Sequence, residues 1–172
     1  ETLRNHLERL RQRDIFPNMI IVDYGDLLRA KSQKDEKRHQ LESIYEELRG
    51  LAQEFKCPIW TASQTNRGGL NAEVITMESI SEAFNKCFVA DFIFSISRTI
   101  QHKNTNGGRM FVAKNRNGPD GLVYPIFMDT ANVKIDVLPQ IETYNEIKQN
   151  EIKKQEESLK EKYKNYRKKR NQ

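Results

Sequence analysis

The chain has 172 residues, with 29 Lys and Arg against 24 Asp and Glu, so its formal net charge is +5. This length is typical of a single domain. Apolar residues make up 37% of the chain, below the roughly 45–50% of ordinary globular domains. No apolar run approaches the roughly 18 residues that a membrane-spanning helix needs. Two cysteines are too few for a disulfide scaffold or a zinc site, so Cys57 and Cys87 are expected to be reduced core thiols of an intracellular protein.

The first half of the sequence predicts two helices, each followed by an apolar strand. Residues 1–13 and 36–56 repeat apolar side chains at spacings of three and four, the periodicity of an amphipathic helix. Residues 19–28 and 58–64 contain short apolar runs, which predict strands buried on both faces of a parallel sheet. The first residue, Glu1, lies inside the first predicted helix, and we therefore expect the chain to be a fragment.

The second half predicts a short helix, a third core strand and then a series of strands joined by tight turns. The expected elements are a helix around 78–86, strands at 90–97, 109–116, 122–129 and 133–138, and a polar helical tail from about residue 140. Strands joined by short turns pair in antiparallel fashion, whereas strands separated by helices form a parallel sheet. The sequence thus predicts an α/β fold with a mostly parallel core, C-terminal antiparallel strands and two parts, 1–139 and 140–172.

Polar side chains follow the first two predicted strands. Asp23 directly follows the first apolar run, and Gln64 ends the second. Sites in α/β sheets gather at the carboxyl ends of the strands. A carboxylate there can hold Mg²⁺ through the ion's waters, and an amide can bind a phosphate. Each residue taken alone is more simply explained as an ordinary strand cap or loop residue.

Two cations lie near the end of the fourth predicted strand. Lys114 and Arg116 are two residues apart, which places both side chains on one face of a strand. They precede a sharp turn at 117–121, and together they suit an anionic phosphate. The alternative is a solvated sheet face that carries two basic residues.

Other kinds of site are disfavoured. The three histidines are scattered over polar segments with no metal-ligand spacing. Ser63 has no His or Asp arranged around it in a nucleophile pattern. A hydrolase with a Ser or Cys nucleophile is therefore not expected.

Four segments in order resemble the C-terminal part of a RecA-like ATPase domain, with its three-layer core. The resemblance is to DnaB-like hexameric replicative helicases, and among them to the T-even phage type. The segments are IIVDYGDLL at 20–28, IWTASQTNR at 59–67, ESISEAFNKCFVADFIFSISR at 78–98 and FVAKNRNGPDG at 111–121. They resemble, in turn, the Walker B strand, the glutamine-sensor strand, the channel-loop segment and the strand that carries Lys and Arg fingers.

The resemblance implies an ATP-driven enzyme with Mg²⁺ as cofactor. Asp23 would hold Mg²⁺ through water at the subunit's own nucleotide, and Gln64 would sense the γ-phosphate. Lys114 and Arg116 would reach into the neighbouring subunit's site. An arginine supplied in trans in this way accelerates phosphoryl transfer by about 10³–10⁵-fold in well-studied cases.

The same resemblance implies a homo-hexameric ring that translocates on single-stranded DNA, with a primase or a helicase loader as further partners and no membrane association. Its location would be the cytoplasm of a bacterial or phage-infected cell. Contacts to the DNA backbone are implied for two loop segments. Their residues are Asn66, Arg67, Ser81, Glu82 and Lys86.

One family motif is missing from the chain. No G-x-x-x-x-G-K-S/T occurs among its residues, and this loop is the one that cradles the phosphates. The domain is therefore expected to be incomplete and inactive as an isolated chain. Two alternatives remain: a catalytically dead RecA-like DNA-binding or scaffold module, and an ATPase of the RecA or KaiC type.

The C-terminal tail is strongly basic. Residues 162–172 hold six cations and no acid, with Tyr163 and Tyr166 among them. Basic and aromatic residues together can bind nucleic acid. The same segment could dock on an acidic protein partner, or it could be a solvated helix that aids solubility.

Overall fold

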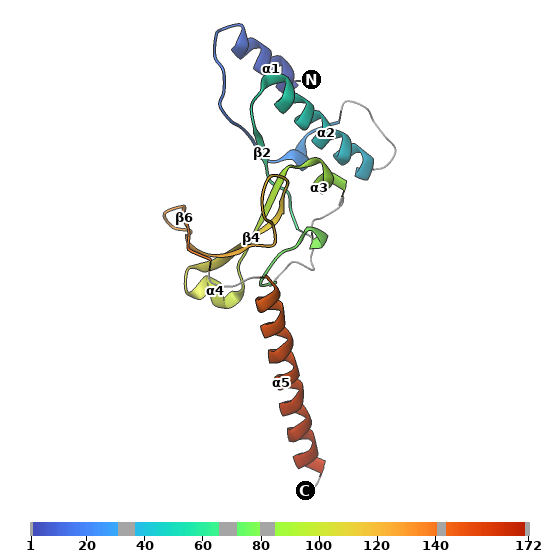
Figure 1. The fold of residues 1–172 in the computed structure, drawn as a ribbon, viewed down its shortest axis with the longest axis vertical. Coiled ribbons are helices and arrows are strands. Elements are labelled where there is room, and N and C mark those ends of the chain that lie inside the picture. Colours follow the sequence, from blue (N-terminus) through green and yellow to red (C-terminus); the bar gives the residue numbers. More distant parts are fainter. Residues whose placement is uncertain (1, 31–36, 66–71, 80–84, 141–143, 171–172) are drawn as a thin grey trace.

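A computed structural model describes residues 2–30, 37–65, 72–79, 85–140 and 144–170 (Figure 1). Its elements, in chain order, are α1 (Thr2–Arg11), β1 (Ile20–Val22), η1 (Gly25–Leu27), α2 (Lys37–Phe55), β2 (Ile59–Thr61), η3 (Met77–Ser79), α3 (Asn85–Val89), β3 (Phe92–Ser97), α4 (Ile100–Asn104), β4 (Gly107–Asn115), β5 (Val123–Asp129), β6 (Lys134–Val137) and α5 (Tyr144–Arg170). The α/β class and nearly every predicted element are confirmed. The helix predicted around 78–86 is represented by η3 and α3, and residues 80–84 between them lie outside the described part.

Two sheets organise the described chain. β1 and β2 form a parallel pair, and β3, β4, β5 and β6 form an antiparallel sheet in sequence order. The parallel part is smaller than expected: β3 is an edge strand of the antiparallel sheet and pairs with neither β1 nor β2. Only nine residues, 98–106, join β3 to β4. This is fewer than the dozen or so that a parallel crossover needs, so the pair is antiparallel.

One core lies between α2 and the parallel pair. Leu41, Ile44 and Leu48 are buried at helical spacing on α2, and Val22 and Ile59 of the two strands pack against them. These side chains share a face of the pair because strand side chains alternate between the two faces.

The opposite face of the parallel pair is only partly covered in the described structure. Ile21 is paired in register with Trp60, and the two residues are 70% and 40% exposed. The prediction that both strands are buried on both faces is therefore wrong for the described chain, since its helices α1 and α2 pack on the other face. The Trp60 ring makes edge-to-face contacts with Phe92 and Phe94 at centroid distances of 6.0 and 5.8 Å, and so connects β2 with β3.

A second core anchors the tail. Ile147, near the start of α5, is buried against Phe111 of β4 and Val123 of β5. The whole of α5 is 27 residues long, about 40 Å at 1.5 Å per residue, and beyond Ile147 it extends away from the sheets (Figure 1). The helical tail is thus confirmed. Among the helices within the described ranges, α5 included, none combines the length and the apolar character that a membrane span requires.

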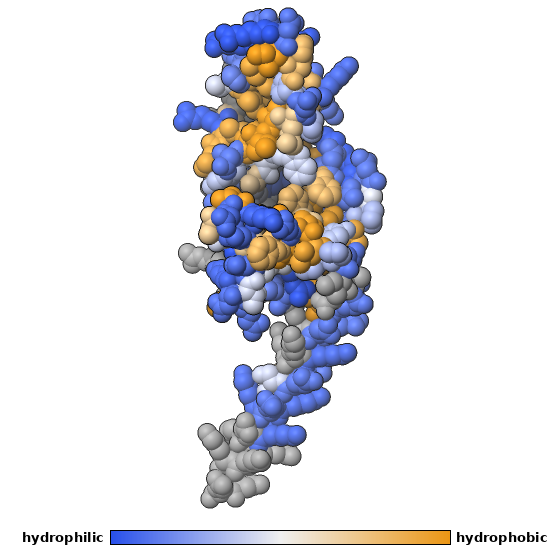
Figure 2. Space-filling model, turned by 90° about the vertical axis from the view of Figure 1, so that its left-hand side faces the viewer, coloured by the Kyte–Doolittle hydropathy of each residue, from blue (hydrophilic) through white to orange (hydrophobic). Residues whose placement is uncertain are grey.

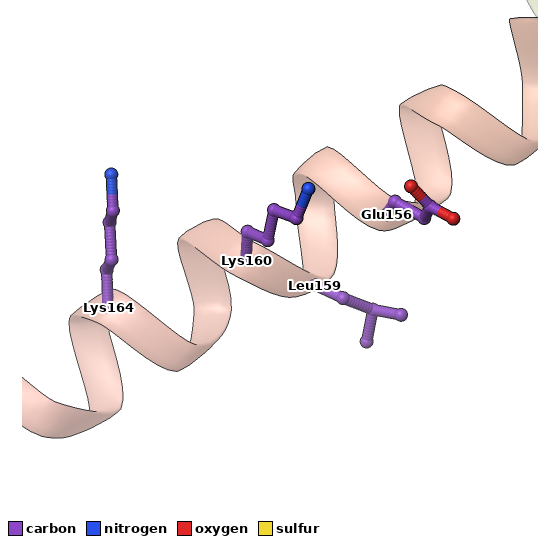
Figure 3. Close-up of a pocket in the computed structure, with 4 residues that line it drawn as sticks. All are labelled: Glu156, Leu159, Lys160 and Lys164. Carbon is purple, nitrogen blue, oxygen red and sulfur yellow. The ribbon is translucent and has the colours of Figure 1, made fainter.

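Charge is unevenly distributed along α5. Residues 144–159 hold three Lys and four Glu, whereas residues 160–170 hold seven cations and one Glu. Figure 3 shows Lys160 and Lys164 on one side of the helix and Leu159 on another. Leu159 is 56% exposed. On the face shown in Figure 2, the coloured part of this helix is mainly hydrophilic, and hydrophobic side chains gather on the body above it. The role of the basic segment stays a prediction.

Candidate functional site

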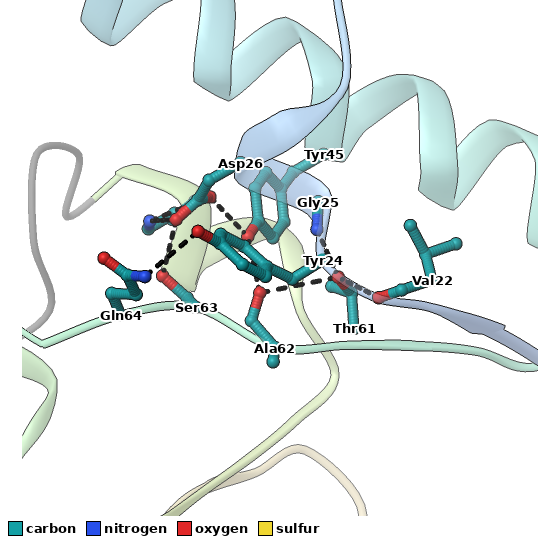
Figure 4. Close-up of polar contacts among 10 residues, drawn as sticks. Val22, Tyr24, Gly25, Asp26, Tyr45, Thr61, Ala62, Ser63 and Gln64 are labelled. Carbon is teal, nitrogen blue, oxygen red and sulfur yellow. Dashed lines mark hydrogen bonds and ion pairs between the residues drawn. The ribbon is translucent and has the colours of Figure 1, made fainter.

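The two strand-end residues lie at the same edge of the parallel pair. The register pairs Val22 with Thr61, so the chain leaves both strands side by side. Asp23 follows β1 at once and is exposed. The Gln64 amide donates from Nε2 to the Tyr24 hydroxyl at 3.0 Å (Figure 4). The expected meeting of strand ends is therefore present, and it leaves the Asp23 carboxylate open to solvent.

A short hydrogen-bond chain holds the segment after β1 against β2. The Gly25 amide donates to Thr61 Oγ1 at 2.7 Å, and this hydroxyl donates to the Val22 carbonyl at 2.9 Å. A Cβ at Gly25 would lie 3.1 Å from Thr61 Oγ1 and 3.2 Å from the Tyr45 ring. Glycine therefore permits the close approach that fixes the turn η1.

Asp26, on this turn, is the centre of a polar cluster that the sequence interpretation missed (Figure 4). Tyr45 donates its hydroxyl to Asp26 Oδ1 at 2.8 Å, and Ser63 donates to Oδ2 at 3.1 Å. Lys86 donates to both oxygens at 3.1 and 3.0 Å. The only available signal was a second acid three residues after Asp23, and the sequence alone does not say which acid faces inward.

This cluster is largely removed from water. The Lys86 side chain is 3% exposed and that of Asp26 is 17% exposed. The Lys86 ammonium also lies 5.6 Å from the Tyr45 ring centroid, within cation–π distance. Burial first, and then the Asp26 carboxylate, raises the pKa of Tyr45, so this phenol stays protonated and remains a donor to Asp26.

The position of Lys86 bears on its predicted contact with DNA. Its ammonium is directed to Asp26 and is almost fully buried. In this conformation it is therefore not exposed to solvent, as a contact with a DNA backbone would require. Direct contact would require the ion pair to open. The other four residues implied to contact DNA, Asn66, Arg67, Ser81 and Glu82, lie outside the described residues, and their role stays a prediction.

Lys114 contacts the end of α3. Its ammonium donates to the Cys87 carbonyl at 2.9 Å and to the Phe88 carbonyl at 3.0 Å. The last carbonyls of a helix have no partner within the helix, so a cation placed there satisfies them. Burial, and then the nearby Arg116, lowers the pKa of Lys114.

Arg116 directly follows β4, and the expectation that it shares a strand face with Lys114 stays a prediction. Its guanidinium pairs with Asp91 Oδ1 at 2.7 Å, and Arg49 of α2 pairs with the same oxygen at 3.1 Å. The Arg116 and Asp91 side chains are about half exposed, at 48% and 55%. Exposed ion pairs of this kind contribute only about 0–1 kcal/mol, so Arg116 can exchange Asp91 for another anion at little cost.

The donor set suits part of a magnesium–nucleotide site. Asp23 is a single exposed carboxylate at a strand end, and Mg²⁺ typically keeps several waters and binds through one or two carboxylates together with phosphates. Within the described ranges, no group of three His, Cys, Asp or Glu residues could enclose a metal by itself.

Together the parallel pair, its strand-end residues and the antiparallel strands define part of a RecA-like ATPase domain. Solved structures support this fold. The chain superposes on one solved ATPase domain with a TM-score of 0.66 and 20% identity, covering 77% of this chain and 49% of that one. It also superposes on a DnaB-like replicative helicase whose structure was described together with its interactions with primase, with a TM-score of 0.61 and 21% identity, covering 71% and 31%.

The chain belongs to the DnaB-like helicases, since a model of the family's C-terminal domain matches residues 1–136. The DnaB-like replicative helicase of Enterobacteria phage T4 is 29% identical over 102 residues, which is 57% of this chain and 22% of that protein. Replicative DNA helicase DnaC of Bacillus subtilis is 28% identical over 137 residues, 76% and 30% respectively. The chain thus spans less than a third of the length of these relatives.

Proposed function

We propose that the chain is the C-terminal part of the ATPase domain of a replicative DNA helicase, which uses ATP hydrolysis to move along single-stranded DNA. The observation that carries this proposal is that Asp23 and Gln64 follow paired parallel strands at the same edge, where Gln64 donates to Tyr24, the residue next to Asp23. Family membership supports the reaction class, and the site supports the placement of the reacting groups.

In this proposal each strand-end residue has one task. Asp23 would hold Mg²⁺ together with ATP, and the ion would supply positive charge to the phosphates. Gln64 orients toward the γ-phosphate, and its present partner, Tyr24 Oη, keeps the amide at the strand edge. Any movement of Gln64 would act directly on the segment that follows it, which contains Asn66 and Arg67.

Lys114 and Arg116 serve a different nucleotide, the one held by the neighbouring subunit. Both already bind oxygen atoms, Lys114 at the end of α3 and Arg116 at Asp91. Phosphoryl oxygens are stronger partners for a guanidinium than a half-exposed carboxylate, because the bidentate geometry and the larger charge favour them. The proposal therefore requires a homo-oligomeric ring, with six subunits proposed.

The nucleic-acid contacts are proposed for two segments that lie outside the described residues. Asn66 and Arg67 follow Gln64 in the sequence, and Ser81 and Glu82 precede α3. Contacts of this kind bind the backbone and are blind to sequence. A primase or a helicase loader is proposed as a further partner, in the cytoplasm of a bacterial or phage-infected cell.

The proposal predicts different activities for the chain and for the whole protein. The purified 172-residue chain is expected to show no Mg²⁺-dependent ATP turnover, because its sequence holds no phosphate-binding loop. The whole protein is expected to hydrolyse ATP, and single-stranded DNA is expected to stimulate it. Phosphate release measured on both preparations checks this, with omission of Mg²⁺ as the control. Turnover by the isolated chain, or none by the whole protein with DNA, would contradict the proposal.

A further inference from the structure

The short helix α3 is held at its end by two cations from distant parts of the chain. Lys114 of β4 binds the Cys87 and Phe88 carbonyls, and Arg49 of α2 donates to the Val89 carbonyl. Three of the four terminal carbonyls of α3 are thereby satisfied from outside the helix. The position of the Lys114 ammonium therefore depends on where α3 lies.

The start of α3 is held from the other side. Lys86 binds both oxygens of Asp26, which lies three residues after Asp23. The carboxylate is fixed in turn by Tyr45 of α2 and by Ser63, the residue before Gln64. Removing one member of a buried ion pair is costly because it leaves an unpaired charge. The pair therefore fixes the distance between α3 and the strand ends.

Two consecutive residues of α3 thus bind different partners, Lys86 through its ammonium and Cys87 through its carbonyl. Lys86 connects the helix to the strand ends that carry Asp23 and Gln64, and Cys87 connects it to Lys114. We propose that Lys86 is a positioning residue: through Asp26 it places α3, and through α3 it places Lys114 relative to the subunit's own strand-end site. This inference rests on the proposed function, because it assigns Lys114 to the neighbouring nucleotide.

The arrangement gives Lys86 a role other than direct contact with DNA. The Lys86 side chain is 3% exposed and donates hydrogen bonds to both oxygens of one carboxylate. It therefore fixes the position of α3 and is not available to bind a ligand. A change at the Ser63–Gln64 segment moves a partner of Asp26, and the Asp26–Lys86 pair carries that change to α3. The strand-end site and the trans-acting cation are thereby connected within one subunit.

The first test needs no enzymatic activity. Lys86→Met in the 172-residue chain is expected to raise amide hydrogen exchange at Cys87–Val89 by about tenfold or more, while the amides of α2 change little. Lys86→Arg retains the charge and is expected to show a smaller change. Lys103→Met, at an exposed lysine of α4, is the matched control. Unchanged exchange at α3, or an equal rise over the whole chain, would overturn the inference. If Lys86→Met does not fold, Asp26→Asn is expected to raise exchange at Cys87–Val89 in the same localised way. Unchanged exchange there, or an equal rise over the whole chain, would again overturn the inference.

The second test uses the whole helicase and a double-mutant cycle. Lys86→Met is expected to lower kcat for DNA-stimulated ATP turnover by about 10²-fold, the size of a misplacement by roughly 1 Å, with KM for ATP nearly unchanged. The double variant Lys86→Met, Lys114→Ala is expected to be no slower than Lys114→Ala alone, because both changes remove the same positioned cation. Multiplying effects would overturn the inference. An inactive wild-type ring would instead refute the proposed function, and the exchange experiment would still decide whether Lys86 fixes α3.

Discussion

Replacing Arg116 with alanine in the assembled protein is expected to lower kcat for DNA-stimulated ATP turnover by about 10³-fold or more, the range found for arginine fingers supplied in trans. Its guanidinium is half exposed and held by one carboxylate, Asp91. It is thus available to a phosphoryl group without breaking a buried contact. Because Arg116 lies beyond the end of β4, its loss removes no core packing.

The matched control is Arg11→Ala, at an exposed arginine of α1 whose nearest acid, Glu8, lies 3.8 Å away. This variant is expected to keep wild-type turnover. Arg116→Lys retains the charge but not the planar bidentate geometry, so it is expected to recover only part of the rate. Steady-state kinetics with saturating DNA measures all three variants. Wild-type kcat in Arg116→Ala would mean that the residue does not act on any nucleotide.

Replacing Leu41 with alanine is expected to lower the free energy of unfolding by about 2–5 kcal/mol, the cost of truncating a buried leucine. Leu41 is 3% exposed and lies in the cluster that joins α2 to Val22 and Ile59. The truncation leaves a cavity beneath β1 and β2. This cavity weakens the packing that supports the strand ends. Urea denaturation of the 172-residue chain, followed by circular dichroism, measures the loss.

Leu159→Ala supplies the control with the same chemical change. This leucine is 56% exposed on α5, so the expected change is within about 0.5 kcal/mol, as for other surface substitutions. Equal destabilisation by the two substitutions would show that the α2 cluster is not the core that supports the strand ends.

The fold was predictable wherever the information was local. The periodicity over 36–56 predicted α2, and the tight turns of the second half predicted the antiparallel strands. Two features were not predictable in this way. The pairing partner of β3 depends on a nine-residue connection that contains α4, whose only sequence signal is the N-cap Thr99 with His102. The exposure of Ile21 depends on what packs against the second face, and periodicity within the strand does not report it.

The candidate site, too, was predictable only where the signal was local. Asp23, Gln64, Lys114 and Arg116 could be singled out because strand ends and a spacing of two are local patterns. The partners of these residues could not, because they come from far along the chain. Lys86 meets an acid 60 residues away, at Asp26. Long-range pairs of this kind follow from the packed fold, so the cluster that connects the two sets of candidate residues became visible only in the structure.

Complementation in mixed rings of the whole protein tests directly whether each nucleotide site is shared between subunits. Asp23→Asn subunits keep their Arg116, and Arg116→Ala subunits keep their Asp23. Each variant alone is expected to be nearly inactive in ATP turnover. Subunits mixed before assembly are expected to regain turnover, because some interfaces then combine an intact Asp23 with an intact Arg116. A mixture no more active than the two separate preparations would contradict a nucleotide site shared between subunits.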